Sequence, residues 1–124
     1  MNMQESGEMY LETILVLKSR QDTVRAIDIA EDMGFSKPSV SRALSILREE
    51  KYISVDGKGF ISLTRKGSQV AKKIYERHVV LSDMLIALGV DKKTALEDAC
   101  RVEHVISDRS FAAIKKRMAE YKKG

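Results

Sequence analysis

The chain has 124 residues and a hydrophobic fraction of 44%, enough for one core or for two small cores joined by a shared helix. Its formal net charge of +4 permits nucleic-acid binding but does not establish it. No apolar run reaches the ~18 residues that span a membrane, and residues 1–5 lack the features of a signal peptide. A single cysteine excludes an internal disulfide. We therefore expect a cytoplasmic protein with no membrane partner.

The first predicted helix covers residues 6–19, with Ser6 as its N-cap. It carries one apolar stripe at helical spacing, formed by Tyr10, Ile14 and Leu17. Met9 and Glu12 lie three residues apart on a neighbouring face. On this segment alone, Met9 can be an ordinary core residue and Glu12 a solvated one.

The next two predicted helices form a helix-turn-helix. The first covers residues 24–33, turns Ile27 and Ala30 inward and stops at Gly34. The second is capped by Ser36, has Pro38 in its first turn and ends near residue 50. A helix, a glycine-containing turn and a second helix are typical of DNA-binding proteins.

A β-hairpin is predicted directly after these helices. Residues 52–55 and 60–64 alternate in polarity around a glycine-rich turn at residues 56–59. A hairpin in this position is the wing of a winged helix. The ordered set of elements predicts a DNA-binding domain more specifically than any element does alone.

The predicted recognition helix carries small polar residues and one arginine on its exposed face. Small residues let a helix lie close in the major groove, while Arg42 can reach guanine or a phosphate. Two further candidates for phosphate contacts are Lys58, which lies on the predicted wing, and Arg25. The alternative is an ordinary solvated face. The candidate DNA-binding residues are Arg25, Ser36, Lys37, Pro38, Ser39, Ser41, Arg42 and Lys58.

The second half of the chain is also predicted to be helical. A long helical pattern follows residues 65–67 and ends at Gly89. Another helix runs from residue 91 or 92 to 106, with Asp91 as its N-cap, and a last one covers residues 110–121. Five apolar side chains should enter the core or a subunit interface: Leu81, Leu85, Val105, Phe111 and Ile114.

Three potential metal ligands gather in the helix predicted to end at residue 106. Cys100, Glu103 and His104 would share one helical face, within about 5–6 Å of one another. A thiolate, a carboxylate and an imidazole suit a divalent transition metal, but a fourth ligand must come from elsewhere. Alternatively, Cys100 and Met9 are core and His104 makes a hydrogen bond, or Cys100 is the thiol of a redox-sensing winged-helix regulator.

An enzyme is not expected. The sequence lacks a recognisable nucleophile, a second acid/base pair and a glycine-rich phosphate loop, so we expect no small-molecule substrate.

With the helix-turn-helix, the long helix and the Cys-x-x-Glu-His cluster in view, the chain resembles the diphtheria-toxin-repressor family of iron- and manganese-dependent regulators. The most specific stretches are residues 8–11, 36–41 and 100–108. The resemblance implies a mainly α fold without the family's SH3-like domain. A winged helix-turn-helix DNA-binding domain would occupy residues 1–70, and a helical metal-binding and dimerisation domain residues 71–124.

The resemblance also implies a ligand set, which combines two branches of the family. The iron branch resembles this chain at Met9, Cys100, Glu103 and His104, and the manganese branch at Glu12 and His78. The ancillary site of the iron branch would retain His78, but two of its other ligands fall on Ser82 and Leu96, which replace them poorly.

The implied cofactor is Fe(II) or Mn(II), and the soft sulfur donors favour iron. The implied function is metal-dependent repression of metal-uptake genes. A metal between the two domains would fix the geometry of a homodimer on a palindromic operator in double-stranded DNA.

Overall fold

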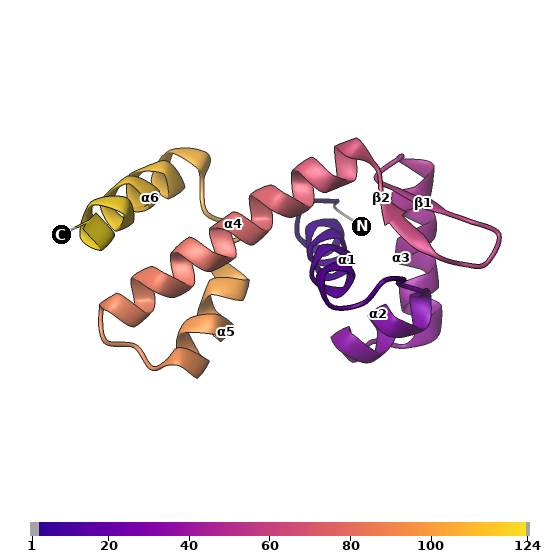
Figure 1. Ribbon diagram of the computed structural model, residues 1–124, viewed down its shortest axis with the longest axis horizontal. Helices are drawn as coiled ribbons and strands as arrows, with labels where there is room; N and C mark the ends of the chain where they lie inside the picture. Colours follow the sequence, from indigo (N-terminus) through magenta and orange to yellow (C-terminus); the bar gives the residue numbers. More distant parts are fainter. Residues whose placement is uncertain (1–2, 124) are drawn as a thin grey trace. The chain divides into compact units, whose positions relative to one another are not determined.

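The structure, a computed structural model, describes the backbone of residues 3–123 and divides into two compact units, the first ending at Lys72 and the second beginning at Lys73. Figure 1 labels the elements along the chain. They are η1 (Met3–Gly7, a π-helical turn), α1 (Glu8–Arg20), α2 (Ala26–Met33), α3 (Lys37–Glu49), β1 (Ile53–Val55), β2 (Ile61–Leu63), α4 (Arg65–Ala87), α5 (Lys92–Val102) and α6 (Asp108–Lys123). The prediction of a mainly α fold with a winged helix-turn-helix is confirmed. Among the described residues, none of the helices is long and apolar enough to cross a membrane.

The first unit has one apolar core. Leu11 and Ile14 of α1, Ile29 of α2 and Leu47 of α3 are wholly buried, and Ala71 of α4 joins them. Burying each of the larger aliphatic side chains contributes about 1.5–3 kcal/mol to the stability of the folded state. The core therefore fixes α1, α2 and α3 against one another.

The inward face of α2 differs from the prediction. Ile27 is 40% exposed, whereas Ile29 is wholly buried. The helix begins at Ala26 instead of residue 24, and its buried stripe passes through Ile29, Ala30 and the half-buried Met33. Ile27 is about 200° around the helix from Ile29 at 100° per residue, so it faces away.

The N-terminal cap predicted for the first helix is wrong. Ser6 lies inside η1, and Gly7 next to it has helical dihedral angles (φ −62°, ψ −42°) with no side-chain cap. Helical backbone continues through both residues, so no helix N-terminus at Ser6 needs a side-chain acceptor.

The turn and cap between α2 and α3 follow the prediction. Gly34 takes the left-handed conformation (φ +69°), and its N–H donates to the Ala30 carbonyl. The Ser36 hydroxyl accepts from the Ser39 N–H (3.3 Å), and Pro38 occupies the first turn of α3. These local signals set where the recognition helix begins.

The wing is a two-stranded antiparallel hairpin in which Ile53 pairs with Leu63 and Val55 with Ile61. The Asp56 carboxylate closes the turn by accepting from the N–H groups of Lys58 and Phe60, both at 2.9 Å.

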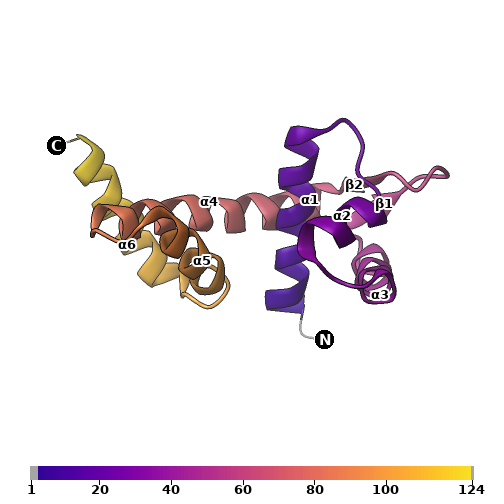
Figure 2. The same cartoon turned by 90° about the horizontal axis from the view of Figure 1, so that it is seen from below.

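The second unit contains most of α4 together with α5 and α6, which can be followed in Figure 2. Ion pairs join α4 to α6 between Glu76 and Lys115 (2.9 Å) and between Asp83 and Lys122 (2.8 Å). Six side chains form the buried apolar set: Ile74, Leu81, Ala95, Ala99, Phe111 and Met118.

Three boundaries in the second unit can be compared with the prediction. Asp91 caps α5 as expected, since its carboxylate accepts from the Thr94 N–H (3.0 Å), a bond that lowers the pKa of Asp91. However, α5 ends at Val102 instead of residue 106, and α6 begins at Asp108 instead of residue 110. Val105 consequently lies in the connecting turn and is 66% exposed, so it does not enter the core of this unit.

We predict that Gly67→Ala destabilises the first unit. A Cβ at this position would lie 2.0 Å from the Tyr52 carbonyl oxygen, so α4 or the start of the wing must move. Such overpacking costs about 1–3 kcal/mol of unfolding free energy. The loss of unfolding free energy is measured by urea denaturation, monitored by circular dichroism. Gly57→Ala is the matched control, because a Cβ there meets nothing within 4 Å. Equal midpoints for the two variants would contradict the prediction.

Candidate nucleic-acid interface and metal centre

The predicted DNA-binding residues of α3 lie at its solvent-exposed face. Lys37, Ser41 and Arg42 are exposed and Ser39 is half-buried. The Ser36 hydroxyl donates to the Ser39 hydroxyl (2.9 Å), and a long contact of 3.5 Å joins Arg42 Nη2 to Ser39 Oγ. The arrangement presents hydroxyls and a guanidinium near a helix N-terminus, which suits a phosphate or a base edge.

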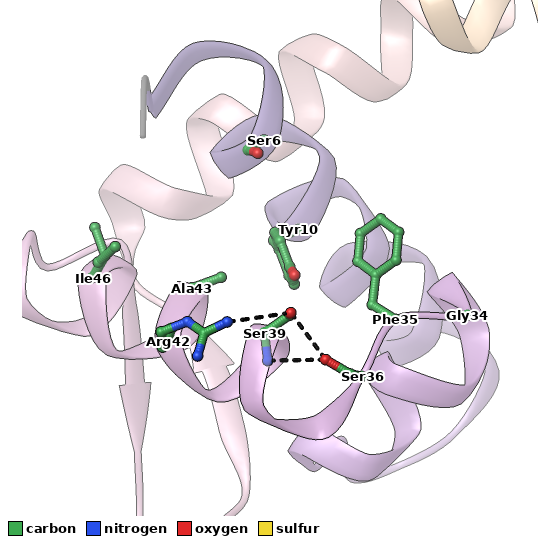
Figure 3. Close-up of a pocket in the computed structure, with 9 residues that line it drawn as sticks. All are labelled: Ser6, Tyr10, Gly34, Phe35, Ser36, Ser39, Arg42, Ala43 and Ile46. Atoms are coloured by element: carbon green, nitrogen blue, oxygen red, sulfur yellow. Dashed lines mark hydrogen bonds between the residues drawn. The ribbon is translucent and has the colours of Figure 1, made fainter.

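Beside this face is a pocket of about 570 Å³, drawn in Figure 3. Ser36, Ser39 and Arg42 line it from α3, and Tyr10 and Phe35 line it from α1 and the turn before α3. The two aromatic rings lie 6.2 Å apart at 55°. Burial raises the pKa of the Tyr10 phenol. Phe35 was not predicted as part of this site, although an aromatic residue directly after the capping Gly34 was a signal for it.

The two remaining predicted DNA contacts lie at the wing. The Arg25 guanidinium lies over the Phe60 ring, 4.6 Å from its centroid, which links the start of α2 to the wing. Lys58 is exposed in the hairpin turn. Each side chain carries a positive charge, which suits a contact with a phosphate of the DNA backbone.

The candidate metal centre of the second unit is built around Glu103. Its side chain is wholly buried, and its two carboxylate oxygens face two imidazoles. Oε2 lies 3.0 Å from His78 Nδ1, and Oε1 lies 3.3 Å from His104 Nε2. The side chains of His78 and His104 are 25% and 4% exposed. Burying a carboxylate is costly unless polar groups surround it, and the His78 imidazole supplies a hydrogen-bond partner for Oε2.

These three donors come from separate elements. His78 is on α4, Glu103 is the C-cap of α5, and His104 lies in the turn that follows. The helix that was predicted to carry Cys100, Glu103 and His104 together ends at Val102, so His104 lies in the turn beyond it. The Val102 carbonyl accepts from the N–H groups of both Val105 and Ile106, at 3.0 Å each, so the chain turns tightly and the helix stops.

The other predicted ligands lie on α1 and near the end of α5. Cys100 is exposed near the end of α5, so the alternative that makes it a core residue is wrong. Met9 and Glu12 are half-buried on α1, in the first unit. At one ligand position of the iron branch's ancillary site, the Ser82 hydroxyl donates to the His78 carbonyl (2.7 Å).

The donors that meet in the second unit fit a divalent transition metal. One carboxylate and two imidazoles supply the oxygen and nitrogen ligands that Fe(II) and Mn(II) accept. The carboxylate oxygens of Glu103 lie 3.0 Å from the His78 imidazole and 3.3 Å from the His104 imidazole, so oxygen and nitrogen donors already lie close together. The donor set thus agrees with the metal centre that the resemblance implies.

Comparison with known proteins assigns both halves of the chain. Residues 2–60 match the family model for the N-terminal DNA-binding domain of iron-dependent repressors, and residues 64–123 match that for their metal-binding and dimerisation domain.

Two curated relatives and two solved structures are similar over most of the chain. An uncharacterised HTH-type transcriptional regulator of Methanocaldococcus jannaschii is 33% identical over 122 residues, covering 97% of this chain and 98% of the relative. The HTH-type transcriptional regulator MntR of Listeria welshimeri is 31% identical over 109 residues, covering 88% and 77%. The manganese regulator SloR has a TM-score of 0.81 at 29% identity, and a manganese-dependent transcriptional repressor in complex with manganese has 0.83 at 28%.

Each structural match covers 90% of this chain, which spans only about half the length of those two proteins (53% and 52%). Nothing in these likenesses favours the thiol-sensing alternative. The two family models together cover nearly the whole sequence. The relative that is 33% identical is matched over 98% of its length. The chain belongs to the iron-dependent repressor family of metal-dependent transcriptional regulators.

Proposed function

We propose that this protein is a Fe(II)- or Mn(II)-dependent repressor whose metal-bound homodimer binds a palindromic operator and controls metal-uptake genes. The observation that carries the proposal is the buried carboxylate of Glu103 between the imidazoles of His78 and His104. When bound, the metal supplies a positive charge that these donors share with ligands outside the second unit. A switch of this kind acts only through its differential affinity for the DNA-binding arrangement.

Residues of both units contribute to the proposed centre. His78, Glu103 and His104 hold the ion from the second unit, and Met9, Glu12 and Cys100 are the candidates that complete its coordination. Ligands from α1 and from the second unit would restrict how the units move relative to each other. The two α3 helices of a two-fold dimer must lie about 34–36 Å apart, or a multiple of this, to enter successive major grooves.

The donor chemistry bears on which metal is bound. The carboxylate and imidazoles that meet in the second unit suit manganese and iron alike, whereas Met9 and Cys100 would favour iron. Two of the similar solved structures are described as a manganese regulator (SloR) and a manganese-dependent transcriptional repressor. Whether Met9 or Cys100 binds the metal through sulfur therefore distinguishes an iron centre from a manganese centre.

We predict that divalent metal stabilises the protein and that Glu103→Gln removes most of this effect. A ligand at about 100 times its Kd adds about 2.7 kcal/mol to the stability of the folded state. Neutralising Glu103 removes the charged oxygen donor, so the melting temperature should respond little to Mn(II) or Fe(II) under anaerobic conditions. Glu97→Gln, at an exposed position of α5, is the matched control. An unchanged metal response in Glu103→Gln would rule out this centre.

We predict that metal strengthens DNA binding and that Arg42→Ala weakens it by about 1–3 kcal/mol, with relaxed preference at one base. Lys58→Ala should weaken binding evenly across sequences and reduce the salt dependence by about one counterion. Anaerobic fluorescence anisotropy with promoter DNA, in chelator and then in metal, measures both effects.

Arg117→Ala provides the control for loss of positive charge, since this exposed residue lies on α6, outside the DNA-binding unit. Its affinity for DNA should remain that of the wild type. Equal DNA binding with and without metal would contradict the metal switch, and unaltered base preference in Arg42→Ala would remove Arg42 from base recognition.

We predict that Cys100 ligates Co(II), which serves as an optical probe of the centre. A thiolate ligand gives the Co(II) complex a charge-transfer absorption that oxygen and nitrogen donors do not give. Cys100→Ser should lose this absorption while retaining weaker binding through His78, Glu103 and His104. An identical spectrum in wild type and Cys100→Ser would exclude the thiolate and favour the manganese assignment.

A further inference from the structure

One buried cation in the second unit contacts the segment that carries two of the metal donors. Arg77 of α4 is only 6% exposed. Its Nη1 donates to the carbonyl oxygens of Glu103 (3.2 Å) and Ile106 (2.7 Å). Its Nη2 donates to the Asp108 carboxylate at the start of α6. One guanidinium thus joins α4 to both ends of the turn between α5 and α6.

This contact supplies hydrogen-bond donors to two backbone carbonyls, one at the C-cap of α5 and one in the turn that follows. The last carbonyls of a helix have no partner within the helix, and the negative end of the helix dipole favours a cation there. Glu103 and Ile106 present their carbonyls at this point, and a planar guanidinium can bond several acceptors in a fixed geometry. The conformation of the turn therefore depends on Arg77.

The position of Arg77 in the sequence adds to its effect. It directly precedes His78, so one short segment of α4 carries the first imidazole and also holds the backbone of Glu103. Lys73, one turn earlier, pairs with the same Asp108 carboxylate (3.1 Å). Lys73 first, and Arg77 to a smaller extent, hold the pKa of Asp108 below its ordinary value.

We propose that Arg77 is the positioning residue of the metal centre. It fixes the turn at residues 103–106 so that the Glu103 carboxylate already lies beside the His78 and His104 imidazoles before metal arrives. Arg77 acts through backbone carbonyls and does not touch the ion. This inference rests on the proposed function, and it adds a residue that metal-ligand chemistry alone would not identify.

The test compares Arg77→Met with Arg77→Lys in the full-length chain. Anaerobic calorimetry with Mn(II) as the probe measures affinity, and amide hydrogen exchange of the metal-free protein measures order in the turn. Arg77→Met should bind Mn(II) about 10–100-fold more weakly, as loss of a supporting contact around a metal typically does. The Val105 and Ile106 amides, both bonded to the Val102 carbonyl, should exchange faster. Arg77→Lys should recover part of both losses, because an ammonium can reach one carbonyl but cannot form the fork.

Two further variants separate positioning from general stability. Lys73→Met removes the exposed partner of Asp108 and should leave Mn(II) affinity unchanged. Asp108→Asn keeps Arg77 and its two carbonyl contacts, so it should weaken Mn(II) binding less than Arg77→Met does. If Arg77→Met fails to fold, Arg77→Lys and Asp108→Asn still carry the comparison, and wild-type Mn(II) affinity in both would overturn the inference.

The outcomes distinguish this inference from the function on which it rests. If the wild type binds Mn(II) and Arg77→Met binds it equally well, the positioning role is wrong and the proposed function stands, even if the melting temperature has fallen. If the wild type itself does not bind Mn(II) or Fe(II), the proposed function fails and the positioning role fails with it. Weakened affinity together with faster exchange confined to the turn supports the inference.

Discussion

The burial of the Glu103 carboxylate is the constraint on which the second unit depends. A charged carboxylate away from water needs compensating polar groups, and here they are imidazoles on two different stretches of chain. Glu103 reaches His78 from the C-cap of α5, which ends at Val102, and His104 meets Glu103 from the turn that follows. The Arg77 guanidinium donates hydrogen bonds to two backbone carbonyls of this segment. The residue at which α5 ends therefore determines where the donors of the candidate metal centre lie.

The features of the DNA-binding unit that the sequence predicted correctly are those determined by neighbouring residues. Gly34 ends α2 because only a left-handed residue closes that turn easily, and Ser36 and Pro38 start α3 through contacts within three residues. The hairpin follows from alternation around Asp56 and two glycines. Such information is local, so a single sequence contains it.

The features that the sequence predicted wrongly depend on distant partners. The end of α5 is stabilised by Arg77, 26 positions before Glu103, and no periodicity in residues 91–106 reveals that contact. Ser6 is an ordinary N-cap residue by type, but a π-helical turn extends through it. The ligand types were recognisable from the residues and the resemblance, whereas the grouping of His78 with Glu103 and His104 came from the resemblance and the structure together.

The backbone bond between the Ile61 N–H and the Val24 carbonyl (2.8 Å) has a consequence for solubility. A two-stranded hairpin has open edges, and unpaired backbone groups on such edges invite pairing with the strands of other molecules. In this protein the segment before α2 occupies part of the β2 edge, and the strands are only three residues long. The wing therefore offers little template for self-association through β-sheet formation.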